Sequence, residues 1–154
     1  VLRAFGEEFF LRCVRFLENP GISVVRDALR ARSSTRVSGM HDPTEGGVLS
    51  GAYEMARGSG VGLRLELERV PVYEETAKLC AHFGISPYRS IASGSLLIAV
   101  PERDRGALEK AFADVSPLSL IGVFTDEGAG MRVVGNGREE ELKPSGIDDI
   151  TRIL

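Results

Sequence analysis

Hydrophobic and polar positions follow two different periods along the chain, and these periods predict its helices and strands. Apolar residues recur every three to four positions, as on one face of a helix, over residues 4–18, 22–32, 42–57, 72–83 and 102–114. Apolar residues alternate with polar ones, or run together, over residues 36–41, 61–67, 96–100, 118–124, 131–134 and 139–143. This order of elements predicts an α/β fold in which helices cover a mixed sheet.

For three segments the sequence also predicts which faces of a strand are buried or how two strands are joined. Residues 61–67 alternate apolar and polar, as in a strand with one buried face. Residues 96–100 are all apolar, which is typical of a central strand covered on both faces. The dipeptide Asn136-Gly137 predicts a tight hairpin between the last two strands. The tail, residues 144–154, is expected to pack loosely.

The start of the 42–57 helix carries the most chemical information. Asp42 stands at a predicted N-cap, Pro43 at the first helical position, and Glu45 where it could close a capping box. Gly46 and Gly47 follow, although each costs a helix about 1 kcal/mol relative to alanine. Paired glycines suggest that a ligand or another backbone comes close. A helix start with bare N–H groups can hold an anion, but the glycines could equally pack against a neighbouring strand.

Two neighbouring segments could contribute to such a site. His41 could polarise a carbonyl group or, when protonated, bind an anion. Ser93, Gly94 and Ser95 could present donors to a ligand, or they could form a tight turn into the next strand. Residues 58–60, Gly-Ser-Gly, are interpreted as the end of a helix, because a phosphate loop must follow a strand and open a helix.

Composition limits the possible functions. The chain has 154 residues and a net charge of −3, so one domain is expected and a nucleic-acid partner is not. Cys13 and Cys80 lie in helical patterns without a Cys-x-x-Cys pair, which predicts free thiols and argues against a zinc site. Nothing in the sequence predicts a membrane span or a signal peptide.

The motif His41-Asp42-Pro43-Thr44-Glu45-Gly46-Gly47 resembles the C-terminal domain of the aminoimidazole ribonucleotide (AIR) synthase-related superfamily. Its form is most similar to that of the hydrogenase expression/formation protein HypE and its uncharacterised relatives. Further similarity lies in residues 3–29, 52–56, 60–62, 70–72 with Glu75, 83–87, 93–100 and 121–122, so the resemblance covers nearly the whole chain. It implies a three-layer α/β/α sandwich.

The resemblance also implies a function. Parent enzymes bind ATP and magnesium in an N-terminal domain and activate an amide-type oxygen by phosphoryl transfer. Because the chain begins at Val1 without a methionine, residues 1–154 are expected to be the substrate-side C-terminal domain alone, inactive by itself and without a cofactor or metal of its own. Its expected partners are its own N-terminal domain, a second copy in a homodimer and another protein, and its expected location is the cytoplasm.

By the same resemblance, His41 is the candidate catalytic residue. The residues expected to bind substrate or phosphate in the interdomain cleft are Asp42, Thr44, Gly46, Gly47, Ser93, Gly94 and Ser95. HypE ends in a cysteine that carries a carbamoyl group, whereas this chain ends in Leu154. This chain also has Ser93 where HypE has an acidic residue, and Glu45 where HypE commonly has an arginine. These departures keep an alternative open, namely a non-catalytic domain that binds a metabolite or a protein.

Overall fold

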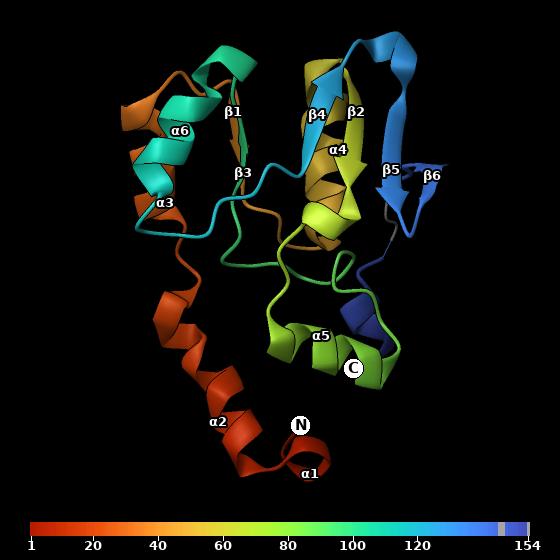
Figure 1. Cartoon of the computed structure of the whole chain (residues 1–154). Coiled ribbons are helices and arrows are strands. Elements are labelled where there is room, and N and C mark those ends of the chain that lie inside the picture. Colours follow the sequence, from red (N-terminus) through yellow and green to blue (C-terminus); the bar gives the residue numbers. More distant parts are fainter. Residues whose placement is uncertain (145–146, 154) are drawn as a thin grey trace.

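The computed structural model describes residues 1–144 and 147–153 and contains six α-helices and six strands among them (Figure 1). The helices are α1 (Leu2–Phe5), α2 (Glu7–Arg15), α3 (Val25–Ser34), α4 (Gly47–Ser59), α5 (Glu74–Phe83) and α6 (Arg105–Phe112). The strands are β1 (Gly39–His41), β2 (Gly62–Glu66), β3 (Leu97–Ala99), β4 (Gly122–Thr125), β5 (Met131–Gly135) and β6 (Arg138–Glu141). Short helical segments span Leu17–Gly21, Leu67–Arg69, Glu102–Asp104, Glu127–Ala129 and Asp149–Arg152.

The strands form two sheets rather than the single mixed sheet that the sequence predicts. β1 and β3 pair antiparallel, with Met40 opposite Ile98. The second sheet has the order β4-β2-β5-β6, in which β2 is antiparallel to β4 and parallel to β5. The predicted α/β class with a mixed sheet is therefore confirmed, although the sheet is split.

The run at 96–100 is apolar because both faces of its strand are covered, although the strand is not central in a sheet as predicted. In the part of the chain that the structure describes, β3 pairs only with β1. Leu97 belongs to the core that α4 forms with β2, whereas Ile98 packs against the cluster of α3 and α6. A strand with both faces covered needs apolar side chains on both, even at the edge of a sheet.

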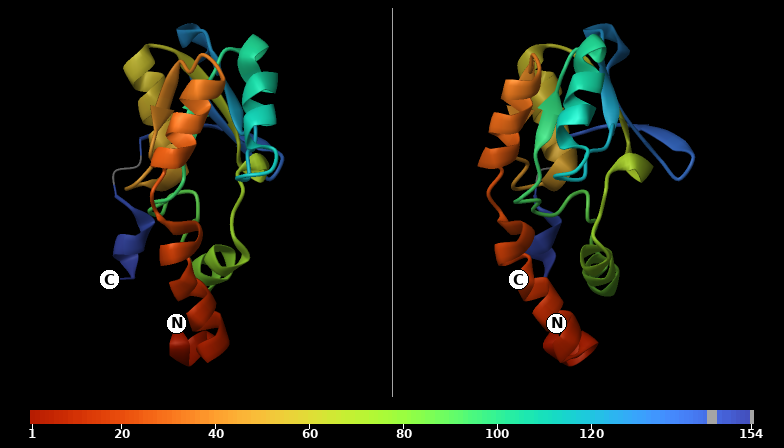
Figure 2. Two further views of the ribbon diagram at one scale, coloured as in Figure 1. Left: turned by 90° about the vertical axis from the view of Figure 1, so that its left-hand side faces the viewer. Right: turned by 60° about the vertical axis from the view of Figure 1, so that its left-hand side comes forward.

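Helices lie on both faces of the β1–β3 pair, which gives the expected three layers there (Figures 1 and 2). α4 provides most of the helical part of the main core, and its residue Ala56 is fully buried. On the opposite side of the pair, α3 and α6 contribute Ala31, Leu108 and Phe112. α4 therefore lies deep in the domain, and its N-terminal end is close to β1.

The N-terminal helices extend away from both sheets, with α5 beside α2 (Figure 1). Phe9 is buried there, but Val14 and Leu17 are 43% and 68% exposed. Val25 and Leu29 of α3 are 60% and 64% exposed. The helical pattern located these helices to within a few residues, although the helix predicted over 4–18 is divided at Gly6. It did not show how little of their apolar surface would find a partner in this domain.

Two local predictions are confirmed. Asn136 and Gly137 have φ angles of 52° and 71°, as a tight hairpin turn between β5 and β6 requires. Gly60 ends α4 in the left-handed conformation, as a C-terminal glycine commonly does. Both cysteines are free thiols. Within the described residues, no helix combines the length and the apolar character needed to cross a bilayer.

Candidate functional site

The predicted capping of α4 is wrong. The helix begins at Gly47, with Gly46 as its N-cap, and no side chain caps it from the N-cap position. Gly46 and Gly47 have φ angles of 72° and 64°, so neither continues a right-handed turn begun at Pro43. The residues before them form a separate turn, in which the Gly47 N–H donates to Thr44 O at 3.2 Å. Asp42, at the start of this 42–47 turn, is exposed and is not the cap.

The close approach that the paired glycines predict does occur, and the approaching group is backbone. A Cβ atom on Gly47 would lie 2.5 Å from Ser90 O and 2.7 Å from Tyr88 O. The Leu49 N–H, in the first turn of α4, donates to Tyr88 O at 3.1 Å. The loop 88–90 therefore covers one side of the helix start, and only glycine fits at position 47.

A carboxylate from the C-terminal tail occupies the remaining side. The Gly46 N–H donates to Asp148 Oδ2 at 2.7 Å in a buried hydrogen bond, and Asp148 is 9% exposed. Its other oxygen, Oδ1, accepts from Ile150 N–H at 2.8 Å, so Asp148 also caps the short helix Asp149–Arg152. The N-terminus of α4 thus holds an oxygen anion that comes from the chain itself, as its dipole favours.

Asp149 fastens the same tail to the adjacent loop. Its Oδ2 accepts from Ser86 N–H at 3.1 Å, and its own N–H donates to Arg89 O at 3.2 Å. Asp149 is 6% exposed, with Arg152 Nη2 at 3.5 Å from Oδ1. Burial, and after it the charge of Asp149, raises the pKa of the Cys80 thiol above its ordinary value.

The expectation of a loosely packed tail is therefore wrong at Asp148 and Asp149, which are buried and bound, although residues 147 and 151–153 are exposed. Sequence reasoning missed Asp148 and Asp149 as parts of this site. An aspartate before a short helix is a readable N-cap signal. Nothing local, however, points to its second partner at Gly46, which is 102 positions away along the chain. Residues 145, 146 and 154 lie outside the described part of the tail.

The other predicted site residues divide between two places. His41 ends β1, half-buried, and its Nε2 lies 2.9 Å from Glu54 Oε2. Thr44 is exposed in the turn, and its carbonyl oxygen accepts from the Ala92 N–H at 3.2 Å. This bond joins the turn to the segment that leads into Ser93–Ser95.

Residues 93–95 are exposed and adjoin another part of the chain. Gly94 has a φ of 96°, and a Cβ atom there would lie 3.0 Å from Gly21 O. Ser95 N–H donates to Ala92 O at 3.0 Å, which closes a tight turn. The tight-turn alternative therefore describes the backbone here, and this segment contacts the 42–47 turn through Ala92.

One buried polar atom at the start of α4 is unsatisfied. Ser50 is 7% exposed, and its Oγ has no hydrogen-bond partner among the described residues. Ser50 lies one turn after Gly46 and Gly47, and helical side chains incline toward the N-terminus of their helix. A buried hydroxyl without a partner is rare in folded proteins.

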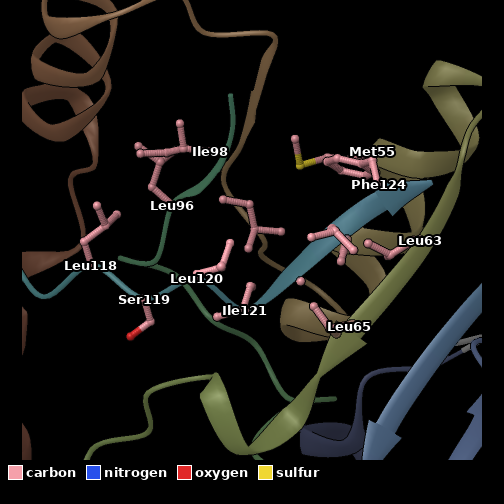
Figure 3. Close-up of a pocket in the computed structure, with 14 residues that line it drawn as sticks. Met55, Leu63, Leu65, Leu96, Ile98, Leu118, Ser119, Leu120, Ile121 and Phe124 are labelled. Atoms are coloured by element: carbon pink, nitrogen blue, oxygen red, sulfur yellow. The ribbon is translucent and has the colours of Figure 1, made fainter. Parts of the chain in front are cut away.

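A separate apolar cavity of about 120 Å³ lies between β3 and β4 (Figure 3). Its floor includes the buried side chains of Leu63 and Leu65, and its rim includes the exposed Leu120 and Phe124. Among the described residues, none of the predicted site residues lines it.

Comparison with known proteins identifies the family. The sequence model described as "AIR synthase related protein, C-terminal domain" matches residues 14–135. The chain belongs to this family. The carbamoyl dehydratase HypE of Rhodobacter capsulatus is 30% identical over 117 residues, a match covering 76% of this chain and 31% of that protein.

Solved structures show the same fold. The crystal structure of Escherichia coli HypE superposes with a TM-score of 0.71 at 24% identity, over 85% of this chain and 42% of that one. A structure of HypE in complex with ATP superposes with a TM-score of 0.64 at 21% identity, over 73% of this chain and 37% of that one. The chain therefore spans less than half the length of these family members.

Proposed function

We propose that this chain is the substrate-side domain of an ATP-dependent enzyme of the AIR synthase-related family, which transfers a phosphoryl group to an amide-type oxygen of a small molecule or a protein. The domain would close over a nucleotide-binding half that supplies ATP and magnesium. In support, the family contains carbamoyl dehydratases, and one structural relative is described in complex with ATP. We also propose a cytoplasmic homodimer that works with a protein partner.

The observation that carries this proposal is the oxygen anion at the start of α4. The Gly46 N–H binds a carboxylate oxygen at 2.7 Å, which is a short bond typical of a charged acceptor. A phosphate or carboxylate of a substrate has the same chemistry. In the proposed active state such a group replaces Asp148 at the Gly46 N–H.

The side chains of the turn have separate roles in this proposal. His41, Asp42 and Thr44 would face the cleft, where the His41 ring would contact the reacting group of the substrate. Gly46 would act through its N–H group, and Gly47 through its lack of a side chain, since its own N–H donates to Thr44 O. Ser93, Gly94 and Ser95 would form the neighbouring edge of the cleft, because Ala92 is hydrogen-bonded to Thr44.

The test is turnover with and without a nucleotide-binding half. The complete protein should release phosphate from Mg-ATP when a suitable amide is present, whereas residues 1–154 alone should not. A thermal-shift screen of the complete protein with nucleotides and small amides would find the substrate class, since a ligand that binds only the native state raises the unfolding midpoint. Steady phosphate release by residues 1–154 alone would contradict the assigned division of labour.

A non-catalytic binding domain is the second candidate, and one observation favours it. Asp148 already satisfies the buried Gly46 N–H, so the turn is complete without a ligand. The substitution D148A tests whether the turn binds an anion. If it does, phosphate binds more tightly to D148A than to the unaltered chain, because its competitor has been removed, whereas a turn that serves packing alone gains no affinity for phosphate. Turnover of the complete protein with Mg-ATP then separates the enzyme from a domain that only binds.

A further inference from the structure

His41 and Glu54 form a hydrogen-bonded pair beside the 42–47 turn. His41 is the last residue of β1, and Glu54 lies on α4, so the pair joins the strand to the helix. Their Nε2 and Oε2 atoms are 2.9 Å apart. The side chains are 35% and 61% exposed, so a ligand could reach the pair from solvent.

Gly51 determines where the imidazole ring can lie. A Cβ atom on Gly51 would be 3.0 Å from His41 Cδ2 and 2.8 Å from the Cβ of Pro43. Gly51 is inside α4, where glycine costs about 1 kcal/mol relative to alanine. The ring therefore lies against bare helix backbone, and its position is linked to that of the turn through Pro43.

The pairing with Glu54 decides which ring nitrogen carries the proton. An ionised carboxylate only accepts hydrogen bonds, so Nε2 must be the donor. The neutral ring then keeps its lone pair on Nδ1, which Glu54 does not bind. We propose that Glu54 and Gly51 are positioning residues that hold His41 in this tautomer, so that Nδ1 accepts a hydrogen bond from a protonated oxygen of the substrate.

This inference rests on the proposed function, which places His41 in the cleft. It adds the class of ligand atom that His41 recognises, namely an O–H group on a phosphate or an activated acyl group. Hydrogen phosphate is a suitable probe, because it carries one O–H donor together with oxygens that can bind backbone N–H groups.

The experiment is ¹⁵N NMR of the His41 ring in the full chain at pH 8, with and without inorganic phosphate. In the unaltered chain, Nε2 should show the shift of a protonated nitrogen and Nδ1 that of an unprotonated one, and phosphate should move Nδ1 more than Nε2. In E54A the second tautomer should appear, and the shift that phosphate causes at Nδ1 should become smaller. E54Q keeps an acceptor oxygen and should lie between the two.

Controls separate positioning from charge and from folding. E45Q removes a negative charge from an exposed residue of the same turn and should leave the tautomer unchanged. G51A should displace the His41 ring while Glu54 remains in place. Because the added Cβ also presses on Pro43, the decisive variant is E54A. An unchanged tautomer in E54A overturns the positioning role. The tautomer could instead depend on Glu54 in a complete protein that does not bind phosphate. That result would support the positioning role and overturn the proposed anion site.

Discussion

The two ends of α4 hold glycines with the same backbone angle in opposite surroundings. Gly47 and Gly60 both have a φ of 64°. A Cβ atom on Gly60 would meet nothing within 4 Å, whereas one on Gly47 would overlap the backbone of Tyr88 and Ser90. The C-terminal end is closed by its own helix, since Gly60 N–H donates to Arg57 O at 3.3 Å. The N-terminal end is closed by two distant segments.

The unpaired backbone groups at one end of α4 are therefore bonded by neighbouring residues, and those at the other end by residues far away in the sequence. At position 60, glycine is favoured only because the backbone is left-handed. At position 47, the backbone is left-handed too, and the neighbouring backbone of Tyr88 and Ser90 leaves no room for a Cβ atom. The N-terminus of α4 therefore depends on the loop 88–90 and on the tail at Asp148.

The largest effect is expected from G47A, with G60A as its matched control. G60A should lower the free energy of unfolding by about 1 kcal/mol, the cost of a left-handed non-glycine residue. G47A carries the same cost and must also push back the carbonyl of Ser90, so we expect a loss of about 3 kcal/mol. Urea denaturation of the two variants measures the difference directly. Equal losses would mean that the loop 88–90 moves freely away from α4.

Asp148 provides the second test, because it closes the same helix end from another direction. D148A leaves the buried Gly46 N–H and the Ile150 N–H without an acceptor, so stability should fall by about 2 kcal/mol. D148N keeps one acceptor oxygen and should lose about half as much. The control is D126A, since Asp126 is exposed and makes no side-chain hydrogen bond at its short helix. A loss in D148A no larger than in D126A would show that the tail does not hold the turn.

The same contrast explains how far the sequence could predict the structure. The C-terminal end of α4 and the Asn136-Gly137 hairpin were predictable because their chemistry lies within a few residues of the chain. The N-terminal end was not, because the partner of Gly46 is Asp148 and the neighbour of Gly47 is the loop 88–90. Asp42 and Pro43 supplied a convincing local signal for a cap that the long-range contacts overrode.

The candidate site follows the same rule. The motif from His41 to Gly47 located the turn correctly and predicted that something approaches its glycines. It could not show that the approaching groups belong to the chain itself. The His41–Glu54 contact was equally hidden, because it depends on how β1 lies across α4, and this is set by the packing of the core.

The smallest effect on stability is expected from the titration of Cys80. Its measurement tests whether Asp149 holds the tail against residues 86–89. Burial raises the pKa of the Cys80 thiol above the ordinary value of 9.0, and the charge of Asp149 raises it further. The folded state therefore disfavours the thiolate more than the unfolded chain does. The stability that this difference contributes is fully present below pH 9 and is lost as the pH rises through the higher pKa of the folded state. Unfolding free energies measured from pH 8 upward should fall more steeply for the unaltered chain than for C80A, and D149N should reduce the difference. If D149N instead leaves the fall unchanged, Asp149 is not beside the thiol in solution and the tail is not seated as described.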